Sequence, residues 1–229
     1  MTREQDVPTC PYCTAILKKS PQRKTKCHSC SNPIFVKTLP STREKVLVTH
    51  ARAQEIEREW QTRSERARWL QIVEPFGVTA KIFDHVQQEL AGKTNQPESY
   101  KKAAWILLKR ALIAETNLQN QKSLHYNLAL ILEEDNLDFR PHLEKAAELG
   151  LLHLKESCRS LPDMKVKILA GELGDSCKAC VALSKKTFTI DEALNLRPLP
   201  CKECTTILNG SRPGFCRCEY TAYSHDWAD

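Results

Sequence analysis

The chain has 229 residues, of which 41% are hydrophobic and 27% charged, and its formal net charge is +6. This composition is ordinary for a globular protein and excludes a chain that is disordered throughout. The longest unbroken apolar run, residues 103–108, is far shorter than the roughly 20 residues of a spanning helix, so we expect no transmembrane segment. Residues 1–6 are polar and carry both signs of charge, and we do not expect them to be a secretory signal.

Eleven cysteines are the most informative feature of the chain. They form an N-terminal and a C-terminal group, and Cys158 stands alone between them. Several occur as Cys-x-x-Cys pairs, or knuckles, in which a short loop turns two thiolates toward one tetrahedral ion. A disulfide framework is expected mainly in secreted chains. The groups therefore predict Zn²⁺ sites, while Cys158 is expected to be a small, partly buried apolar residue.

The first predicted element is a zinc ribbon over residues 1–48. Two knuckles are separated by 13 residues, which fits a ribbon in which each knuckle is the tip of a hairpin. A thioredoxin-like redox site would need one pair ahead of a helix, and the Pro- and Lys-rich surroundings do not favour it. The region has few large apolar residues, so metal must supply the free energy of folding. The predicted ligands are Cys10, Cys13, Cys27 and Cys30.

A strand is expected at 45–48, where it would extend the ribbon sheet. Thr49 is the predicted N-cap of a long helix that Pro75 and Gly77 end. Apolar residues recur on one face of this helix at spacings that suit 3.6 residues per turn. They are Ala53, Ile56, Trp60, Ala67 and Leu70.

Residues 78–157 predict four further helices from apolar positions three and four residues apart. Gly92 is expected to end the first of them and Asp138 to cap the last. The linkers are short and polar, which favours antiparallel packing of neighbours. A helical region over residues 49–160 follows, with a long helix ahead of a small helical bundle.

From residue 161 onward the pattern changes to short strands and turns. Strands are expected at 166–169 and 186–190, and a turn at 174–175. A short helix is expected from Asp191, because a carboxylate is favourable at a helix N-terminus. This order predicts a treble-clef-like zinc module over residues 161–229. The predicted fold class is therefore mainly α, with a small β zinc module at each end.

Six cysteines in this module exceed the four ligands of one tetrahedral ion. Cys177 and Cys180 are the expected seed of the site. Either two of the other thiols are free, or a second ion binds, or the last pair replaces one of the others. The candidate ligands are Cys177, Cys180, Cys201, Cys204, Cys216 and Cys218. The whole chain is expected to bind two Zn²⁺ ions or more.

The tail runs from Cys-Lys-Ala-Cys at 177–180, through Lys-Thr-Phe at 186–188 and Leu-Pro-Cys at 199–201, to Cys-Arg-Cys at 216–218. Over about 45 residues it resembles the cysteine-rich tail of phage head-morphogenesis (minor capsid) proteins. It lacks their His before the last Cys-Arg-Cys. The chain as a whole resembles a family of bacterial and phage zinc-ribbon proteins. The resemblance implies zinc and the cytoplasm of a bacterial cell or phage-infected host, and no known reaction.

The excess of positive over negative charge is confined to residues 1–70, which hold 14 Lys and Arg against 7 Asp and Glu. Four thiolates around Zn²⁺ lower the net charge of this region only from +7 to about +5. Such a patch can neutralise phosphates and release counterions, and Tyr12 and Phe35 are candidates for stacking on bases. The first hypothesis is therefore a non-catalytic protein that binds DNA or RNA. The predicted contacts are Lys18, Lys19, Arg23, Lys24 and Lys26.

Two alternatives stay open. A protein-interaction or scaffold protein of phage or prophage origin would dock a partner on the helical region, and the lysine run would be a solvated loop. A treble-clef nuclease would need a general-base His and an open coordination position. Both cysteine groups can close with sulfur alone, and the tail offers only His225 and Asp226. We therefore predict no catalytic residue, and we expect no membrane partner.

Overall fold

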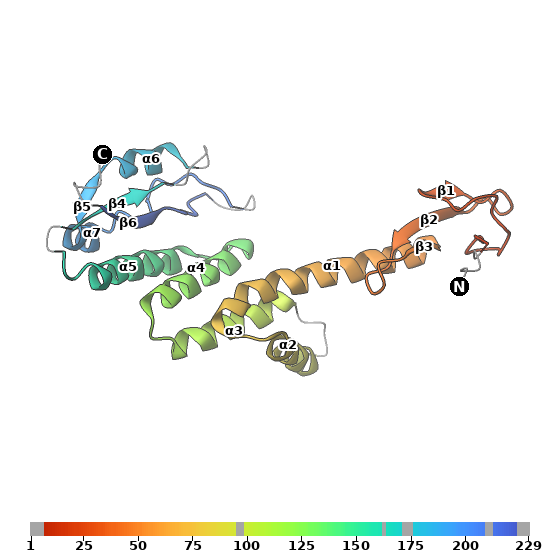
Figure 1. Ribbon diagram of the computed structural model, residues 1–229, viewed down its shortest axis with the longest axis horizontal. Helices are drawn as coiled ribbons and strands as arrows, with labels where there is room; N and C mark the ends of the chain where they lie inside the picture. The colour runs from red at the N-terminus through yellow and green to blue at the C-terminus, as the bar shows by residue number, and fades with distance from the viewer. Residues whose placement is uncertain (1–6, 95–98, 162–163, 171–175, 209–212, 224–229) are drawn as a thin grey trace. The chain divides into compact units, whose positions relative to one another are not determined.

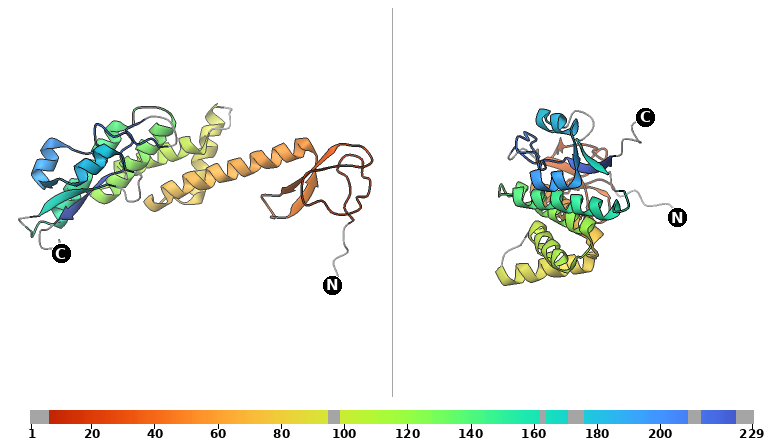
Figure 2. Two further views of the ribbon diagram at one scale, coloured as in Figure 1. Left: turned by 90° about the horizontal axis from the view of Figure 1, so that it is seen from above. Right: turned by 90° about the vertical axis from the view of Figure 1, so that its left-hand side faces the viewer.

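The computed structural model describes residues 7–94, 99–161, 164–170, 176–208 and 213–223. About half of the chain is helical, and two small sheets are antiparallel (Figures 1 and 2). This confirms the coarse prediction of a mainly helical chain with small β regions. No described helix is both long and apolar enough to cross a membrane.

Two compact units make up the chain, residues 1–68 and 69–229. The sequence predicted three regions, with boundaries after residues 48 and 160. Whether these three regions fold independently stays a prediction. The turn expected at 174–175 lies outside the described residues.

The first unit contains a three-stranded sheet with β1 (Thr25–Lys26), β2 (Pro33–Thr38) and β3 (Lys45–Val48). The central strand, β2, pairs antiparallel with both neighbours, and β3 is the strand expected at 45–48. The sheet contributes Ile34, which is fully buried, to a core that also contains thiols. The buried members of this core are Cys10, Leu17, Cys27 and Ile34. Because two of the four are cysteines, the apolar contribution to the stability of this core is small.

The helix α1 (His50–Val73) begins after Thr49, whose hydroxyl accepts a hydrogen bond from the Arg52 amide at 3.3 Å. This confirms the predicted N-cap. The first turns bury Ala53 and Ile56 in a cluster with Val48 of β3. Further along, the indole Nε1 of Trp60 donates to the Thr38 carbonyl at 2.8 Å, which fixes the helix to the end of β2.

Four helices follow in the second unit, as predicted. They are α2 (Ala80–Thr94), α3 (Tyr100–Ala114), α4 (Leu118–Glu134) and α5 (Arg140–Ser157). A short 3-10 helix, Glu74–Phe76, and Gly77 at φ +78° separate them from α1. The last residues of α1 share one core with α2, α3 and α4, and it contains fully buried Phe83, Leu108, Leu124 and Leu128.

Two predicted helix boundaries were wrong by one to three residues. The helix α2 continues through Gly92 to Thr94, because Gly92 does not adopt the left-handed conformation that ends a helix. The N-cap of α5 is Phe139 rather than Asp138. The Asp138 carboxylate still accepts from the Arg140 amide at 3.1 Å, so it satisfies a free N–H of the first turn from one position earlier.

The rest of the second unit is a sheet in the order β5-β4-β6 with two short helices. Its strands are β4 (Lys165–Leu169), β5 (Thr187–Thr189) and β6 (Glu219–Tyr223), and its helices are α6 (Lys178–Ser184) and α7 (Ile190–Leu196). The expected strands and the helix near Asp191 are present, whereas α6 and β6 were not predicted. The sheet and α7 lie along α5 (Figures 1 and 2), where Val166 and Ala193 pack with Leu151.

Phe215 attaches the cysteine-rich segment to the helices. Its side chain is fully buried, with ring centroids 5.6 Å from Tyr126 of α4 and 5.2 Å from Phe139. Nearby, Lys122 of α4 forms an ion pair with Glu219 of β6 at 2.7 Å. The cysteine-rich segment and α4 therefore share one apolar core.

Replacing Phe215 with Ala is expected to lower the free energy of unfolding of the second unit by about 3–5 kcal/mol, because it leaves a cavity between two aromatic rings. Urea unfolding followed by far-ultraviolet circular dichroism measures the change. The control is Ile113→Ala, whose side chain is 86% exposed on α3 and whose loss is expected to cost about 0.5 kcal/mol or less. Equal midpoints for the two variants would contradict the shared core.

Candidate metal centres

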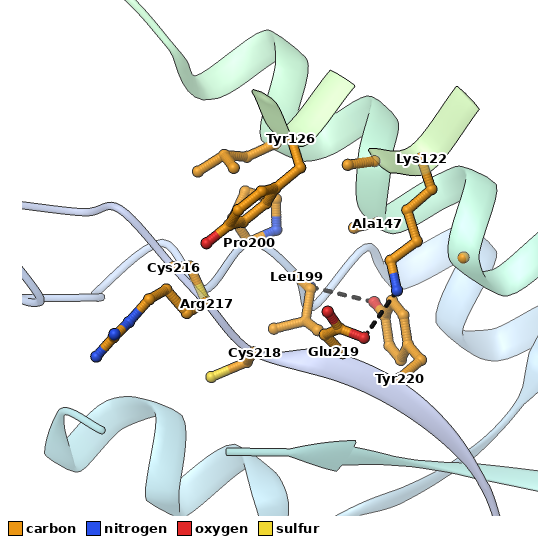
Figure 3. A pocket seen from close by; sticks show the side chains of 13 residues that line it. Lys122, Tyr126, Ala147, Leu199, Pro200, Cys216, Arg217, Cys218, Glu219 and Tyr220 are labelled. Carbon is orange, nitrogen blue, oxygen red and sulfur yellow. Dashed lines mark hydrogen bonds and ion pairs between the residues drawn. The ribbon is translucent and has the colours of Figure 1, made fainter. Parts of the chain in front are cut away.

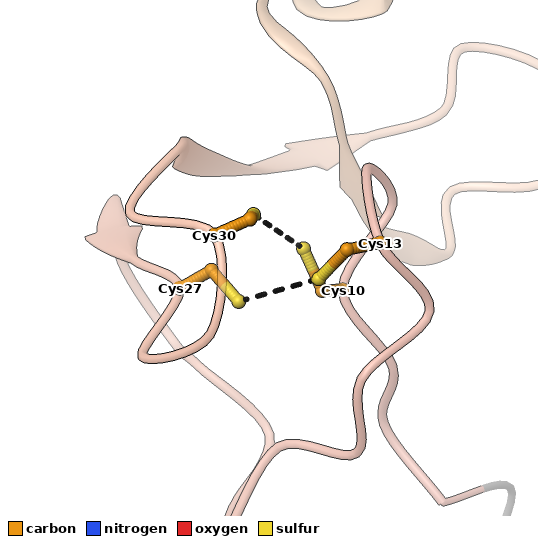
Figure 4. Close-up of side chains that lie close together, drawn as sticks. All are labelled: Cys10, Cys13, Cys27 and Cys30. Atoms are coloured by element: carbon orange, nitrogen blue, oxygen red, sulfur yellow. Dashed lines mark hydrogen bonds between the residues drawn. The ribbon is translucent and has the colours of Figure 1, made fainter.

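Four thiols of the first unit converge on one point (Figure 4), each within 4.8 Å of the others. The Sγ atoms of Cys10 and Cys30 are 3.8 Å apart, and those of Cys13 and Cys27 are 3.7 Å apart. A tetrahedral ion about 2.3 Å from each sulfur places the sulfurs about 3.8 Å from one another. The four predicted ligands are thus brought together at the spacing of a tetrahedral thiolate site, and they could hold a metal ion.

Backbone amides of the two knuckles point at the sulfurs. The Tyr12 amide lies 3.5 Å from Sγ of Cys10, and the Ser29 amide lies 3.4 Å from Sγ of Cys27. Hydrogen bonds from the backbone of Cys30 first, and then of Ser29, lower the pKa of Cys27 to about 6. The thiolate that a metal needs is therefore available at this position near neutral pH.

The six C-terminal thiols gather in one cluster of the second unit. Two groups of three have sulfurs within 4.8 Å of one another, and the distance from Cys180 to Cys216 is 3.8 Å. The sixth thiol, Cys201, is buried in the same cluster. The two groups are Cys177, Cys180 and Cys204, and Cys180, Cys216 and Cys218. This cluster could also hold metal.

Burial opposes ionisation of most of this cluster. It raises the pKa of the Cys180, Cys201 and Cys204 thiols. Two thiols of the cluster are exceptions. A hydrogen bond from Cys218 lowers the pKa of Cys216 to about 5. Burial raises the pKa of Cys177, but hydrogen bonds from the backbone of Cys180 and Thr205 outweigh it and lower that pKa to about 7. A cation would offset the cost of the buried thiolates. Metal binding should therefore release protons and strengthen as pH rises.

The five predicted phosphate contacts line one open groove of about 730 Å³, together with Leu17 and His28. Within the described part of the chain, none of the five forms an ion pair with a carboxylate. The candidate stacking residues are engaged in other contacts. Lys24 Nζ lies 4.7 Å from the centre of the Phe35 ring, and the Tyr12 hydroxyl accepts a hydrogen bond from the His50 amide at 2.8 Å.

The structure also brings together two histidines that the sequence did not connect. Nδ1 of His125 on α4 lies 2.9 Å from Nδ1 of His142 on α5. Burial first, and the charge of His142 next, lower the pKa of His125 to about 4, so both rings are neutral at pH 7. The two histidines are 17 residues apart and lie on different helices, so no sequence pattern predicts that they meet. The other candidates for catalysis, His225 and Asp226, lie outside the described residues.

A small pocket of about 30 Å³ lies between α4, α5 and the segment that leads into β6 (Figure 3). Its walls include Tyr126, Pro200 and Cys216. That volume suits one or two water molecules rather than an organic substrate. Cys158, at the C-cap of α5, belongs to neither thiol group.

No family model, curated protein or solved structure matches the chain.

Replacing Cys27 with Ser is expected to remove the metal of the first unit, because three thiolates no longer close the tetrahedron. The small core around Ile34 should then unfold, while the second unit keeps its helices, since its core consists of other residues. Metal analysis and far-ultraviolet circular dichroism report the two effects. Cys158→Ser is the matched control and should lose no metal. Unchanged metal content in Cys27→Ser would overturn the assignment.

Proposed function

We propose that this is a non-catalytic zinc-binding protein that binds nucleic acid through a basic zinc ribbon, residues 1–48. The observation that carries the proposal is the groove lined by the five cations of the loop between the knuckles. The metal is proposed to be Zn²⁺ because both clusters offer only sulfur, and the first has tetrahedral spacing. The C-terminal module is proposed to be treble-clef-like.

The local charge favours an anionic ligand. Residues 7–43 contain no Asp or Glu. Of the cations in this stretch outside the groove, Lys37 pairs with Glu57 and Arg43 stacks on Trp60. None of the five groove cations pairs with a described carboxylate, although Lys24 lies over the Phe35 ring as Arg43 lies over Trp60. A row of unpaired cations can exchange bound counterions for phosphates, which is the main source of affinity for nucleic acid.

The ends of the basic loop are fixed before any ligand binds. The Leu17 amide donates to the Pro8 carbonyl at 2.8 Å, and the Cys27 amide donates to the Asn32 carbonyl at 2.9 Å. The last two loop residues form β1 and pair with β2. The backbone that carries the cations is therefore held by the sheet and by the metal, and less entropy is lost on binding.

The groove supports contacts to phosphate rather than to bases. Phe35 lies beneath Lys24, and the Tyr12 hydroxyl is used within the fold. Phosphate contacts position a protein on nucleic acid without reading its sequence. We therefore propose binding to DNA or RNA with little sequence preference.

Changing Lys18, Lys19, Arg23, Lys24 and Lys26 together to Gln is expected to flatten the salt dependence of binding. On duplex DNA the log–log slope is about −0.9 for each phosphate contacted, so five contacts contribute roughly −4.5. Zinc content should not change, because none of the five is a ligand. Fluorescence anisotropy with a labelled duplex and a labelled single strand, at several salt concentrations, measures the slope.

The matched control changes four exposed lysines and one exposed arginine of the second unit to Gln. They are Lys81, Lys93, Arg110, Lys185 and Lys186. This variant loses the same charge and should keep the wild-type slope. If the two variants and the wild type give the same curves, the loop is solvated. The protein-interaction alternative, with its resemblance to phage head-morphogenesis proteins, then becomes the better proposal.

A further inference from the structure

The two thiol groups of the chain have different geometry. In the ribbon, four sulfurs all lie within 4.8 Å of one another. Among the six C-terminal sulfurs, all of them in the described part of the chain, no four converge in that way. Instead, two groups of three share one member, Cys180. The five grouped sulfurs are thus divided between two overlapping groups, instead of four of them gathering at one point.

Three segments present these sulfurs in pairs. Cys177 is the N-cap of α6, and Cys180 lies in its first turn. The second pair is held by a tight turn in which the Cys204 amide donates to the Cys201 carbonyl at 3.1 Å. The third pair lies on the segment between buried Phe215 and β6 (Figure 3). Because each pair is fixed by its own element, the shared position of Cys180 follows from the fold.

Each group of three needs one more sulfur to complete a tetrahedron. Cys201 is the only thiol of the six that belongs to neither group. It is 1% exposed and lies in the same apolar cluster as Cys180, Cys204 and Cys216. Cys201 is therefore the remaining thiol of the cluster, and ions bound in the two groups would draw it in as the missing ligand.

Counting ligands then favours two ions. If Cys180 and Cys201 each contact both ions, each ion has four sulfur ligands and no thiol is left over. Two divalent ions with six thiolates carry the same formal charge as one ion with four. The second ion therefore adds no net charge to a buried cluster, where an uncompensated charge would be costly.

We propose that the C-terminal cluster is a binuclear zinc centre in which Cys180 and Cys201 bridge two ions. The terminal ligands are Cys177 and Cys204 for one ion, and Cys216 and Cys218 for the other. This inference rests on the proposed zinc binding and is independent of the proposed nucleic-acid binding.

The first test is the zinc content of the full chain, measured by native mass spectrometry and elemental analysis. One ion in the ribbon and two in the cluster give about three per chain, whereas a four-thiol cluster gives about two. The second test is X-ray absorption on Cys27→Ser, which removes the ribbon ion. Bridging thiolates hold the two remaining ions close together, so zinc–zinc scattering is expected.

Single variants locate the ions. The Cys218 thiol contacts one ion only. Cys218→Ser should therefore lose about one zinc, with the helical content unchanged. Cys180→Ser removes a bridge and should lose about two. Cys158→Ser has the same chemical change outside the cluster and should lose none.

Two zinc ions per chain of which Cys27→Ser removes one, or three without zinc–zinc scattering, would overturn the binuclear centre and leave the proposed zinc binding intact. A Cys218→Ser variant that keeps all its zinc would also overturn it. A chain with no zinc, or with one ion that Cys27→Ser removes, would overturn zinc binding by the C-terminal module itself.

Discussion

Thiolates that face one another repel unless a cation lies between them, and this constraint shapes both ends of the chain. In the first unit the core around Ile34 is small, and two of its four buried residues are cysteines. Burial of so little apolar surface cannot offset the entropy lost by the loops that carry them. A metal ion held by the four thiolates would supply the missing free energy of folding.

The C-terminal cluster differs from the first unit in what stabilises it. Its sulfurs lie in an apolar environment that includes Ile168 and Leu199, and Phe215 anchors the last pair to the helices. This region can gain stability from two sources, metal ligation and the core that it shares with α4. Metal loss should therefore affect the two ends of the chain unequally, with the ribbon the more sensitive.

The two units also differ in net charge. Positive charge lies in the first 70 residues, and the acid-free stretch 7–43 contains the whole cationic groove. The second unit is nearly neutral, and several of its lysines are paired, as Lys122 is with Glu219 and Lys155 with Asp191. An anionic partner would therefore be attracted to the first unit, where β1 and the backbone hydrogen bonds at the ends of the basic loop hold the cations in place.

The sequence alone determined the features that depend on local spacing. Two knuckles 13 residues apart indicated the first thiol group, and apolar periodicity with caps such as Thr49 indicated the helices. Local rules predicted the end of α2 and the start of α5 to within one helical turn. They were not more exact, because Gly92 and Asp138 have more than one allowed role at a helix end. The extended segment β6 was missed, because its pairing partner β4 lies about 50 residues away in the chain.

Only the tertiary structure decided how the late cysteines are grouped. Spacing left three alternatives for six thiols: two of them are free, a second ion binds, or the last pair replaces one of the others. The fold makes Cys180 a member of both groups, buries Cys201 in the same cluster and sets His125 against His142. In the first unit it also gives Tyr12 a hydrogen bond from the His50 amide and places Lys24 over the Phe35 ring. The sequence had suggested both aromatic residues as candidates for stacking on bases. The physical reason is the same in each case: these contacts join residues that no local periodicity relates, and packing alone brings them together.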